Sequence, residues 1–239
     1  EHFIKNMLAG VGGIDLALLI IAANEGVMPQ TKEHLAILDL LGVKKGIVVI
    51  TKKDLVDEEW LSLVKMDVEE LIAPTTLAGS SIVAVSAITK EGLPDLVAAI
   101  DNILSIMQPK KDTGRPRLPI DRVFTIAGAG TIVTGTLLDG SLHAGQEVEI
   151  VPAGLKSRLR GLQTHKTHID SAAPGSRVAA NLVGIATSQL KRGDVLTKPN
   201  WLTPTMMLNV KLRLLTYIRY PLKHNATVSF HSGTSEVMA

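Results

Sequence analysis

The amino-acid sequence predicts an α/β unit built on a parallel sheet, followed by a small β-barrel. In residues 1–107, continuous apolar runs alternate with stretches of helical spacing, a pattern typical of buried parallel strands joined by crossover helices. In residues 120–200, short β-type runs are separated by turn residues, as expected of a barrel. Between them, residues 108–119 are rich in Pro, Lys, Arg and Gly and are expected to form an extended linker.

The first part contains three expected strands and three expected helices. The strands, taken to be buried on both faces, are the runs at 16–23, 46–50 and 81–85. The helices, in which apolar residues recur every three or four positions, are at 31–41, 58–71 and 94–106. Because ligands of parallel sheets bind at the carboxyl ends of the strands, a binding site is expected in the loops that follow Ile50 and Val85.

The second part has the turn-rich pattern of a small barrel. Its expected strands lie at 123–127, 131–138, 147–152 and 177–182. From Met206 onwards, residues 208–212 alternate again as in a strand, and the sequence ends at Ala239. About 35 residues are too few for a separate core, so residues 201–239 are expected to be the first strands of a third domain.

Charge is distributed unevenly along the chain. Residues 1–109 contain 8 Lys and Arg against 15 Asp and Glu, a net charge of −7, whereas residues 110–239 contain 17 against 8, a net charge of +9. The basic second part favours a polyanionic partner, the alternative being a solvated surface with a chance imbalance. The chain has no cysteine, which excludes disulfides and thiolate metal sites and fits a cytoplasmic protein. The longest apolar run, at 16–23, is shorter than the roughly 20 residues needed to cross a bilayer.

Polar residues follow two neighbouring expected strands. Those after the second strand are Thr51, Lys52, Lys53 and Asp54, and those after the third are Ser86 and Ala87. An Asp accepts two hydrogen bonds from the ring N–H and the exocyclic amine of guanine, and the Ala87 N–H would donate to the guanine carbonyl oxygen. Adenine lacks both features, and buried polar partners reject a base that leaves them unpaired. The sequence therefore predicts a guanine pocket. The alternative is that Asp54 caps the following helix and that Lys52 and Lys53 are solvated.

Five segments resemble the EF-Tu-type translational GTPases. Those at 4–7, 26–34, 51–54 and 86–87 are similar to the GTP-binding domain of that family, and 128–135 resembles the start of its second domain. Within the second of these segments, the stretch GVMPQT at 26–31 is highly specific to translational GTPases. The resemblance implies that residues 1–107 are the C-terminal part of a P-loop GTPase-type domain. It further implies a protein that hydrolyses GTP, with Mg²⁺ bound, as a timing switch.

The resemblance also places three of the family's segments before Glu1: the phosphate-binding Gly-rich loop, the first switch and the Asp-x-x-Gly-His segment. Because such segments supply the phosphate and Mg²⁺ ligands, the chain is expected to be an N-terminally truncated piece with no catalytic or metal-binding residue of its own. Alone it would neither bind GTP well nor hydrolyse it. His2 falls two positions late for the family's catalytic histidine and is expected to be an ordinary helix residue.

Within the family, the chain resembles the selenocysteine-specific elongation factors. Thr51 stands where most relatives have Asn, and the segments at 120–124, 173–179 and 231–237 are similar to segments of this branch. The resemblance implies a carrier of selenocysteyl-tRNA to the ribosome, which binds a selenocysteine-insertion mRNA element through further C-terminal domains. It also implies an aminoacyl pocket formed by three residues, Asp121, Arg122 and Arg177.

The aminoacyl pocket has a chemical rationale. A selenol is much more acidic than a serine hydroxyl, so at neutral pH the selenocysteine side chain is an anion. The permanently charged guanidinium groups of Arg122 and Arg177 would favour that anion over serine, and Asp121 is expected to hold one of them in place. The alternative for both arginines is a solvated charge at a strand edge.

Two other functions remain open at this point. The first is that of another EF-Tu relative: the general elongation factor, an archaeal-type initiation factor gamma subunit, or the GTPase subunit of a sulfate adenylyltransferase. The second is a non-catalytic binding module, in which the barrel docks RNA or a protein partner. An upstream Gly-Lys-Ser/Thr loop would favour the enzyme, and a C-terminal array of winged helices would favour the selenocysteine-specific branch.

Overall fold

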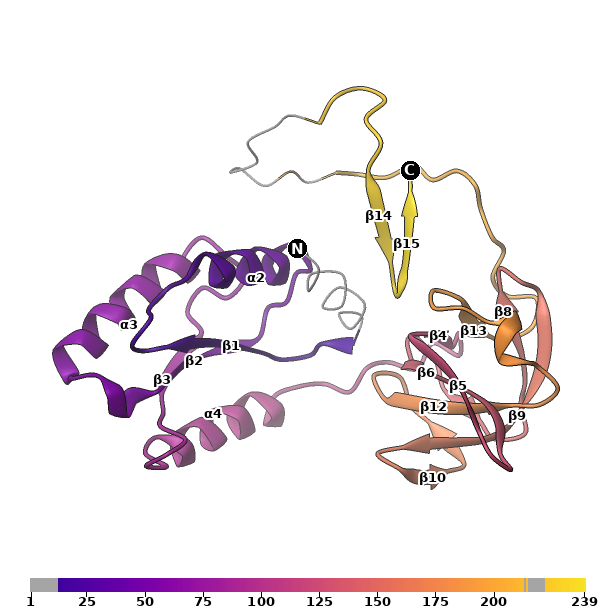
Figure 1. The fold of residues 1–239 in the computed structure, drawn as a ribbon, viewed down its shortest axis with the longest axis horizontal. Helices are drawn as coiled ribbons and strands as arrows, with labels where there is room; N and C mark the ends of the chain where they lie inside the picture. The colour runs from indigo at the N-terminus through magenta and orange to yellow at the C-terminus, as the bar shows by residue number, and fades with distance from the viewer. Residues whose placement is uncertain (1–12, 213, 215–221) are drawn as a thin grey trace. The chain divides into compact units, whose positions relative to one another are not determined.

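The computed structural model describes residues 13–212, 214 and 222–239. Ile14–Pro109 form one compact unit, and Lys110–Ala239 belong to a second (Figure 1). Within the described ranges, no helix has both the length and the apolar character required to span a membrane. The family motif at 4–7 and His2 lie outside the described residues.

The first unit is a parallel sheet with helices on both faces. Its strands, in the spatial order β1-β2-β3, are β1 (Ala17–Ala22), β2 (Gly46–Thr51) and β3 (Ser81–Ala84). The helices are α2 (Pro29–Leu40), α3 (Glu58–Ile72) and α4 (Leu93–Ser105). Apolar residues of α2 and α3 form one core with the sheet, and those of α4 form another, so α2 and α3 cover one face and α4 covers the other (Figure 1). The predicted α/β architecture is confirmed.

The expectation that all three strands are buried on both faces is wrong for the outer strands. β2 is buried almost throughout and β3 is half-buried, whereas in β1 Leu18 and Ile20 are 43% and 53% exposed. These two residues are aligned with Ile47 and Val49 of β2, on the face that α4 covers by packing over β2 and β3. Because α4 does not reach over β1, this face of β1 stays open in the part of the chain that the structure describes.

Asp57 caps the N-terminus of α3. Its carboxylate accepts a hydrogen bond from the backbone N–H of Trp60 at 2.8 Å, which satisfies one of the donors that the first helical turn leaves unpaired. Glu58 and Glu59 add negative charge in that turn, which is favourable to the helix dipole. Because Asp57 is the cap, the alternative in which Asp54 caps this helix is wrong.

Replacing Asp57 by Ala is expected to lower the free energy of unfolding by about 1 kcal/mol, because the N–H of Trp60 loses its partner. Asp57→Ser is the matched control, since a serine hydroxyl caps a helix about as well as a carboxylate. Urea denaturation followed by far-ultraviolet circular dichroism measures both variants. Equal destabilisation by the two substitutions would contradict the capping role.

The second unit is built on a curled antiparallel sheet. Its main strands, in spatial order, are β4 (Arg117–Pro119), β13 (Val195–Thr197), β8 (Glu147–Val151), β9 (Leu155–Thr164), β12 (Arg177–Leu182), β6 (Gly130–Thr136) and β5 (Arg122–Ile126). β10 (Thr167–Ile169) pairs with β9 and belongs to the same sheet, whereas β7 (Leu142–His143) and β11 (Ser171–Ala172) form a separate two-stranded sheet. Backbone hydrogen bonds in both directions between Arg117 and Leu138, at 3.0 and 2.8 Å, join β4 to the residues after β6. The sheet therefore curls towards closure, as predicted for a barrel.

The barrel interior is apolar. Its fully buried side chains include Leu118, Val133, Val148, Ile150, Leu159, Leu162, Val178 and Leu196. Because successive residues of a strand point to opposite faces, the positions between these core residues face outwards. Arg122 of β5 and Arg177 of β12 are at such outward positions and are exposed.

The strands expected at 123–127, 131–138, 147–152 and 177–182 are confirmed as β5, β6, β8 and β12. The long strand β9 was not predicted. Its register on β12 shifts near Arg160, so the buried Leu159 and Leu162 are three positions apart and the two-residue period is broken, as at a β-bulge. The strand β4 lies inside the stretch expected to be a linker.

The strand expected at 208–212 is not formed. Residues 206–212 are exposed and have no strand partner within the described residues. Alternation alone does not make a strand, because the backbone N–H and C=O groups need a neighbouring strand. Further along, β14 (Ser229–Ser232) and β15 (Ser235–Met238) form an antiparallel hairpin. The boundary between a second and a third domain stays a prediction.

Candidate nucleotide and aminoacyl sites

The two loops expected to hold a purine base lie side by side. They leave the carboxyl ends of β2 and β3, which are neighbouring parallel strands. The backbone N–H of Lys53 donates to the carbonyl of Val85 at 3.1 Å, and the N–H of Val85 donates to the carbonyl of Ile50 at 2.8 Å. These bonds bring Asp54 and Ala87, each one or two residues further along its loop, to the same edge of the sheet.

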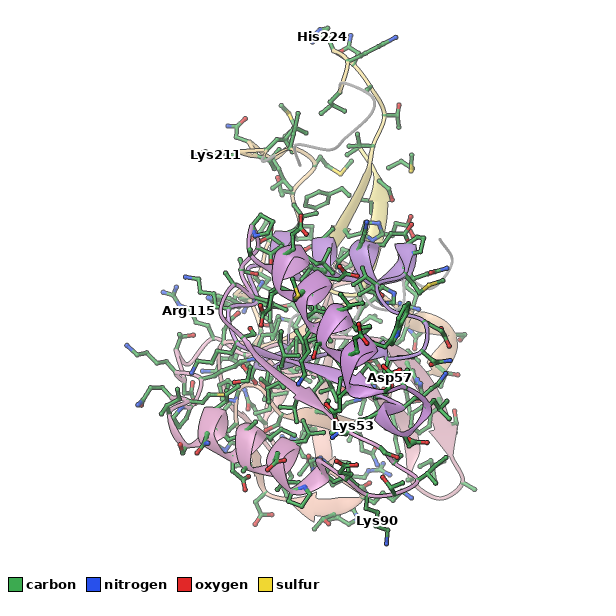
Figure 2. All side chains as sticks on the ribbon, turned by 90° about the vertical axis from the view of Figure 1, so that its left-hand side faces the viewer. Lys53, Asp57, Lys90, Arg115, Lys211 and His224 are labelled. Atoms are coloured by element: carbon green, nitrogen blue, oxygen red, sulfur yellow. The ribbon has the colours of Figure 1, made fainter. Side chains whose placement is uncertain are left out.

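Lys53 joins the two loops through its side chain. Its ammonium group donates to Glu91 at 2.6 Å and lies 3.5 Å from the carboxylate of Glu58 at the start of α3. Figure 2 shows Lys53 between Asp57 and Lys90, the chain neighbours of those two carboxylates. The hydrogen bond to Glu91 raises the pKa of Lys53 above its ordinary value. The alternative in which Lys53 is merely solvated is wrong.

Lys52 adopts a left-handed backbone conformation, with φ 57° and ψ 36°, which is uncommon for a residue with a side chain. Its ammonium group pairs with Glu25, in the loop after β1, at 2.9 Å. Thr51, the last residue of β2, donates its hydroxyl to the carbonyl of Ile21 in β1 at 3.4 Å. The loop is therefore anchored to β1 as well as to β3.

Asp54 and Ala87 present polar groups that lack a partner. Asp54 lies in the short 3₁₀ turn η2 (Lys53–Leu55), is exposed, and its carboxylate makes no hydrogen bond or ion pair within the described residues. The backbone N–H of the exposed Ala87 likewise has no acceptor in that part of the chain. An acceptor of two hydrogen bonds and a donor are thus available at one edge of the sheet, which is the complement of the guanine edge.

Ser86 shapes the second loop from inside. It is fully buried, and its hydroxyl accepts hydrogen bonds from the backbone N–H groups of Ile88 and Thr89 at 3.2 and 3.1 Å. Its own N–H donates to the carbonyl of Glu91 at 3.0 Å. Because these bonds close a tight turn, Ser86 fixes the position of the neighbouring Ala87.

The carboxylates that hold the two lysines are not apparent from the sequence. Glu25 and Glu91 lie 27 and 38 residues away from Lys52 and Lys53 along the chain, so no local pattern links them. The order of the strands in the sheet could have predicted that Glu25 lies near Lys52. Glu25 follows the strand next to β2, and the carboxyl ends of neighbouring parallel strands meet at one edge of the sheet.

In the second unit, Asp121 and Arg177 form an ion pair. A guanidinium N–H of Arg177 donates to one carboxylate oxygen of Asp121 at 2.5 Å, and the hydroxyl of Thr134 donates to the other at 2.6 Å. The side chain of Asp121 is only 17% exposed, so the pair is partly shielded from water. The backbone N–H of Asp121 also donates to the carbonyl of Thr134 at 2.9 Å. Asp121 is therefore fixed at two points and orients Arg177.

Arg122 shares the outward face of Arg177 but makes no ion pair within the described residues. It is aligned with Thr134 of β6, and Arg177 is aligned with Thr136 of the same strand. Residues opposite each other in antiparallel strands, and residues two apart in one strand, share a face. Only β6 separates the two arginines, and they are offset by two residues along it, so their backbones are about 12 Å apart. The two arginines thus lie on either side of β6 and share one face of the sheet.

A cavity that the sequence did not reveal opens on the same face. It has a volume of about 280 Å³ and a mainly apolar lining, which includes Ile126 of β5 and Ile132 of β6. The side chains of Arg160 and Asn181 at its wall both donate to the carbonyl of Ala129 at 3.0 Å. The side-chain oxygen of Asn181 is buried without a hydrogen-bond partner among the described residues. An apolar cavity with one unsatisfied acceptor therefore lies on the face that carries Arg177, and Ala179 in its lining is two residues from Arg177 along β12.

Two family models match the chain. The elongation factor Tu GTP binding domain matches residues 1–105, and elongation factor Tu domain 2 matches residues 130–197. The parallel sheet with its two loops falls in the first match, and most of the barrel falls in the second. Together they define the class of the protein, which is that of the EF-Tu-type translational GTPases.

Individual relatives narrow this class. Over all 239 residues the chain is 47% identical to the selenocysteine-specific elongation factor of Desulfomicrobium baculatum, of which it spans 38%. Its structure is similar to translation elongation factor SelB of Methanococcus maripaludis in complex with the GTP analogue GppNHp, with a TM-score of 0.88 and 31% identity over 99% of this chain and 53% of that one. A bacterial selenocysteine-specific elongation factor, EF-Sec, matches with a TM-score of 0.78 and 35% identity over 83% of this chain and 34% of that one. Over its whole length the chain is therefore similar to a selenocysteine-specific elongation factor, and it spans about a third to a half of the length of these relatives.

Proposed function

We propose that this protein binds GTP and delivers selenocysteyl-tRNA to the ribosome for selenocysteine incorporation. The observation that carries the proposal is the Asp121–Arg177 ion pair with Arg122 on the same outward face, in a chain 47% identical to a selenocysteine-specific elongation factor. The relatives favour this function over those of a general elongation factor, an initiation factor subunit or a sulfate adenylyltransferase subunit.

In the proposed guanine pocket, Asp54 accepts hydrogen bonds from the ring N–H and the exocyclic amine, and the N–H of Ala87 donates to the ring carbonyl. Adenine offers neither that donor pair nor a carbonyl, and each protein group that the bound base would cover and leave unpaired costs about 1–3 kcal/mol. Lys52 packs its aliphatic stem along the base, as long charged side chains do on apolar surfaces. Thr51 and Ser86 hold the two loops in place.

GTP hydrolysis is proposed as the step that times release of the tRNA on the ribosome. In GTPases the phosphates and Mg²⁺ are held by a Gly-rich loop with its Lys, by a Ser or Thr, and by an Asp. The residues of the proposed guanine pocket select the base, and none of them is proposed to bind the phosphates or Mg²⁺. Mg²⁺, the ribosome and the mRNA element are therefore proposed from family membership, together with the cytoplasm as the place of action.

The proposed aminoacyl site distinguishes selenocysteine from serine by charge. At neutral pH the selenol is an anion and the serine hydroxyl is neutral, so only selenocysteine gains charge-assisted hydrogen bonds from guanidinium groups. Arg122 and Arg177 outweigh the single negative charge of Asp121, which leaves the site cationic. The amino acid is esterified to the terminal nucleoside of the tRNA, and the apolar cavity on the same face of the sheet offers room for part of that end.

Binding of charged tRNA to the full-length protein tests the proposal. One tRNA body is charged with selenocysteine or with serine, so that the RNA contacts are equal in both ligands. With a non-hydrolysable GTP analogue, the selenocysteyl form is expected to bind at least about tenfold more tightly. Equal affinities would overturn the aminoacyl site, and equal support of binding by an ATP analogue would overturn the guanine pocket.

A further inference from the structure

The tip of the β14–β15 hairpin contacts the barrel next to the aminoacyl site. Thr234, at the tip, donates its hydroxyl to the carbonyl of Ile120 at 2.7 Å. The packing around it is close, since a methyl group placed on Gly233 would lie 3.1 Å from the side chain of Pro119. The hairpin tip is therefore packed against the residues that lead into β5.

Ile120 is held by its side chain and by both of its backbone polar groups. Its side chain is fully buried in the barrel core. Its N–H donates to the carbonyl of Asp194 at 2.8 Å, and its carbonyl accepts from the N–H of Gly193 at 3.0 Å as well as from Thr234. A carbonyl oxygen has two lone pairs, and both are used here, one of them by the hairpin.

The carbonyl of Ile120 and the N–H of Asp121 belong to one planar peptide unit. Donors from the hairpin tip and from the turn before β13 hold its oxygen end, and the carbonyl of Thr134 holds its N–H end. The orientation of this plane sets the direction in which the Asp121 side chain leaves the backbone. Because that side chain orients Arg177, a series of direct contacts runs from the hairpin tip to the guanidinium group.

We infer that Thr234 is a positioning residue for the choice between selenocysteine and serine, acting through the Ile120–Asp121 peptide and the Asp121–Arg177 ion pair. The inference rests on the function proposed for that ion pair. The preference for the anionic side chain depends on the direction of the Arg177 guanidinium group. Contacts with the RNA body do not depend on that direction. Loss of the Thr234 hydroxyl therefore lowers the preference and leaves affinity for seryl-tRNA nearly constant.

Two substitutions at Thr234 test this role. Thr234→Val removes the hydroxyl at nearly constant shape, and Thr234→Ser keeps it. The preference is the Kd of seryl-tRNA divided by the Kd of selenocysteyl-tRNA, measured on the full-length protein with a GTP analogue, well below the melting temperature of each variant. It is expected to fall roughly threefold to tenfold in Thr234→Val, the effect of one lost hydrogen bond. In Thr234→Ser it is expected to stay close to the value of the unsubstituted protein.

Arg177→Ala, measured alongside, separates this inference from the proposed function. If Arg177→Ala loses the preference and Thr234→Val keeps it, the inference is overturned and the proposed site stands. If Arg177→Ala keeps the preference, the proposed site itself is overturned. Equal weakening of both tRNAs by Thr234→Val would show a purely structural role, which also overturns the inference.

Discussion

Asp54→Asn is expected to lower the affinity for GTP and GDP by about a hundredfold. The carboxylate is available to accept two hydrogen bonds from guanine, whereas an Asn side chain presents a donor to one of the two guanine donors. A hydrogen bond to a charged group contributes about 1.5–3 kcal/mol, and a loss of about 2.7 kcal/mol corresponds to a hundredfold change in Kd. Isothermal titration calorimetry of the full-length protein measures the effect.

The same variant, Asp54→Asn, is expected to gain affinity for xanthosine nucleotides. Xanthine carries a carbonyl where guanine carries the exocyclic amine, so the amide N–H of Asn would find an acceptor, and the variant is expected to bind xanthosine nucleotides more tightly than guanosine nucleotides. Asp57→Asn is the matched control. It removes the same charge close by, while Asn still caps α3, and nucleotide affinity should hardly change. Equal losses in the two variants would contradict the role assigned to Asp54.

Arg177→Ala is expected to reduce the preference for selenocysteyl-tRNA over seryl-tRNA by about tenfold to a hundredfold. The charge-assisted hydrogen bond to the selenolate is lost, and a neutral serine side chain loses much less. The substitution also leaves the partly shielded carboxylate of Asp121 without its cation, so that it repels an anionic amino acid. Competition between the two charged forms of one tRNA body measures the change.

Two other substitutions serve as controls for Arg177→Ala. Arg158→Ala removes one positive charge from an exposed position of β9 and should affect both tRNAs equally, as expected of a screened surface charge. Arg177→Lys keeps the charge but not the planar fork of donors, so its preference should lie between those of Arg177→Ala and the unsubstituted protein. An unchanged preference in Arg177→Ala would remove Arg177 from the aminoacyl site.

The elements of the first unit were predictable because their apolar periodicity reflects burial directly. β2 is a continuous apolar run because it is buried on both faces, and the apolar stripe of α3 faces the sheet. Periodicity does not record how many layers cover a strand, which is why the exposure of Leu18 and Ile20 was not foreseen. The alternation of apolar and polar residues at 208–212 likewise does not tell whether a partner strand is present, and the strand predicted there is not formed.

Contacts between distant residues depend on strand register, which local patterns do not carry. Asp121 and Arg177 are 56 residues apart, and they meet because Asp121, just before β5, is hydrogen-bonded to Thr134 of β6, while β12 pairs with the other edge of β6. A shift of one residue in the pairing of β12 with β6 would turn Arg177 to the opposite face. The resemblance suggested that Asp121 holds one of two arginines, and the register determines that it is Arg177.

The left-handed backbone of Lys52 has a consequence for how this protein would respond to selection in the laboratory. Glycine adopts that conformation readily, whereas other residues are disfavoured in it by roughly 1–2 kcal/mol. A screen that rewards survival of heating alone would therefore enrich Gly at this position. The same variants would lack the stem proposed to lie along the base and the ion pair to Glu25. The most heat-resistant clones would thus be poor nucleotide binders, a compromise typical of strained positions at functional sites.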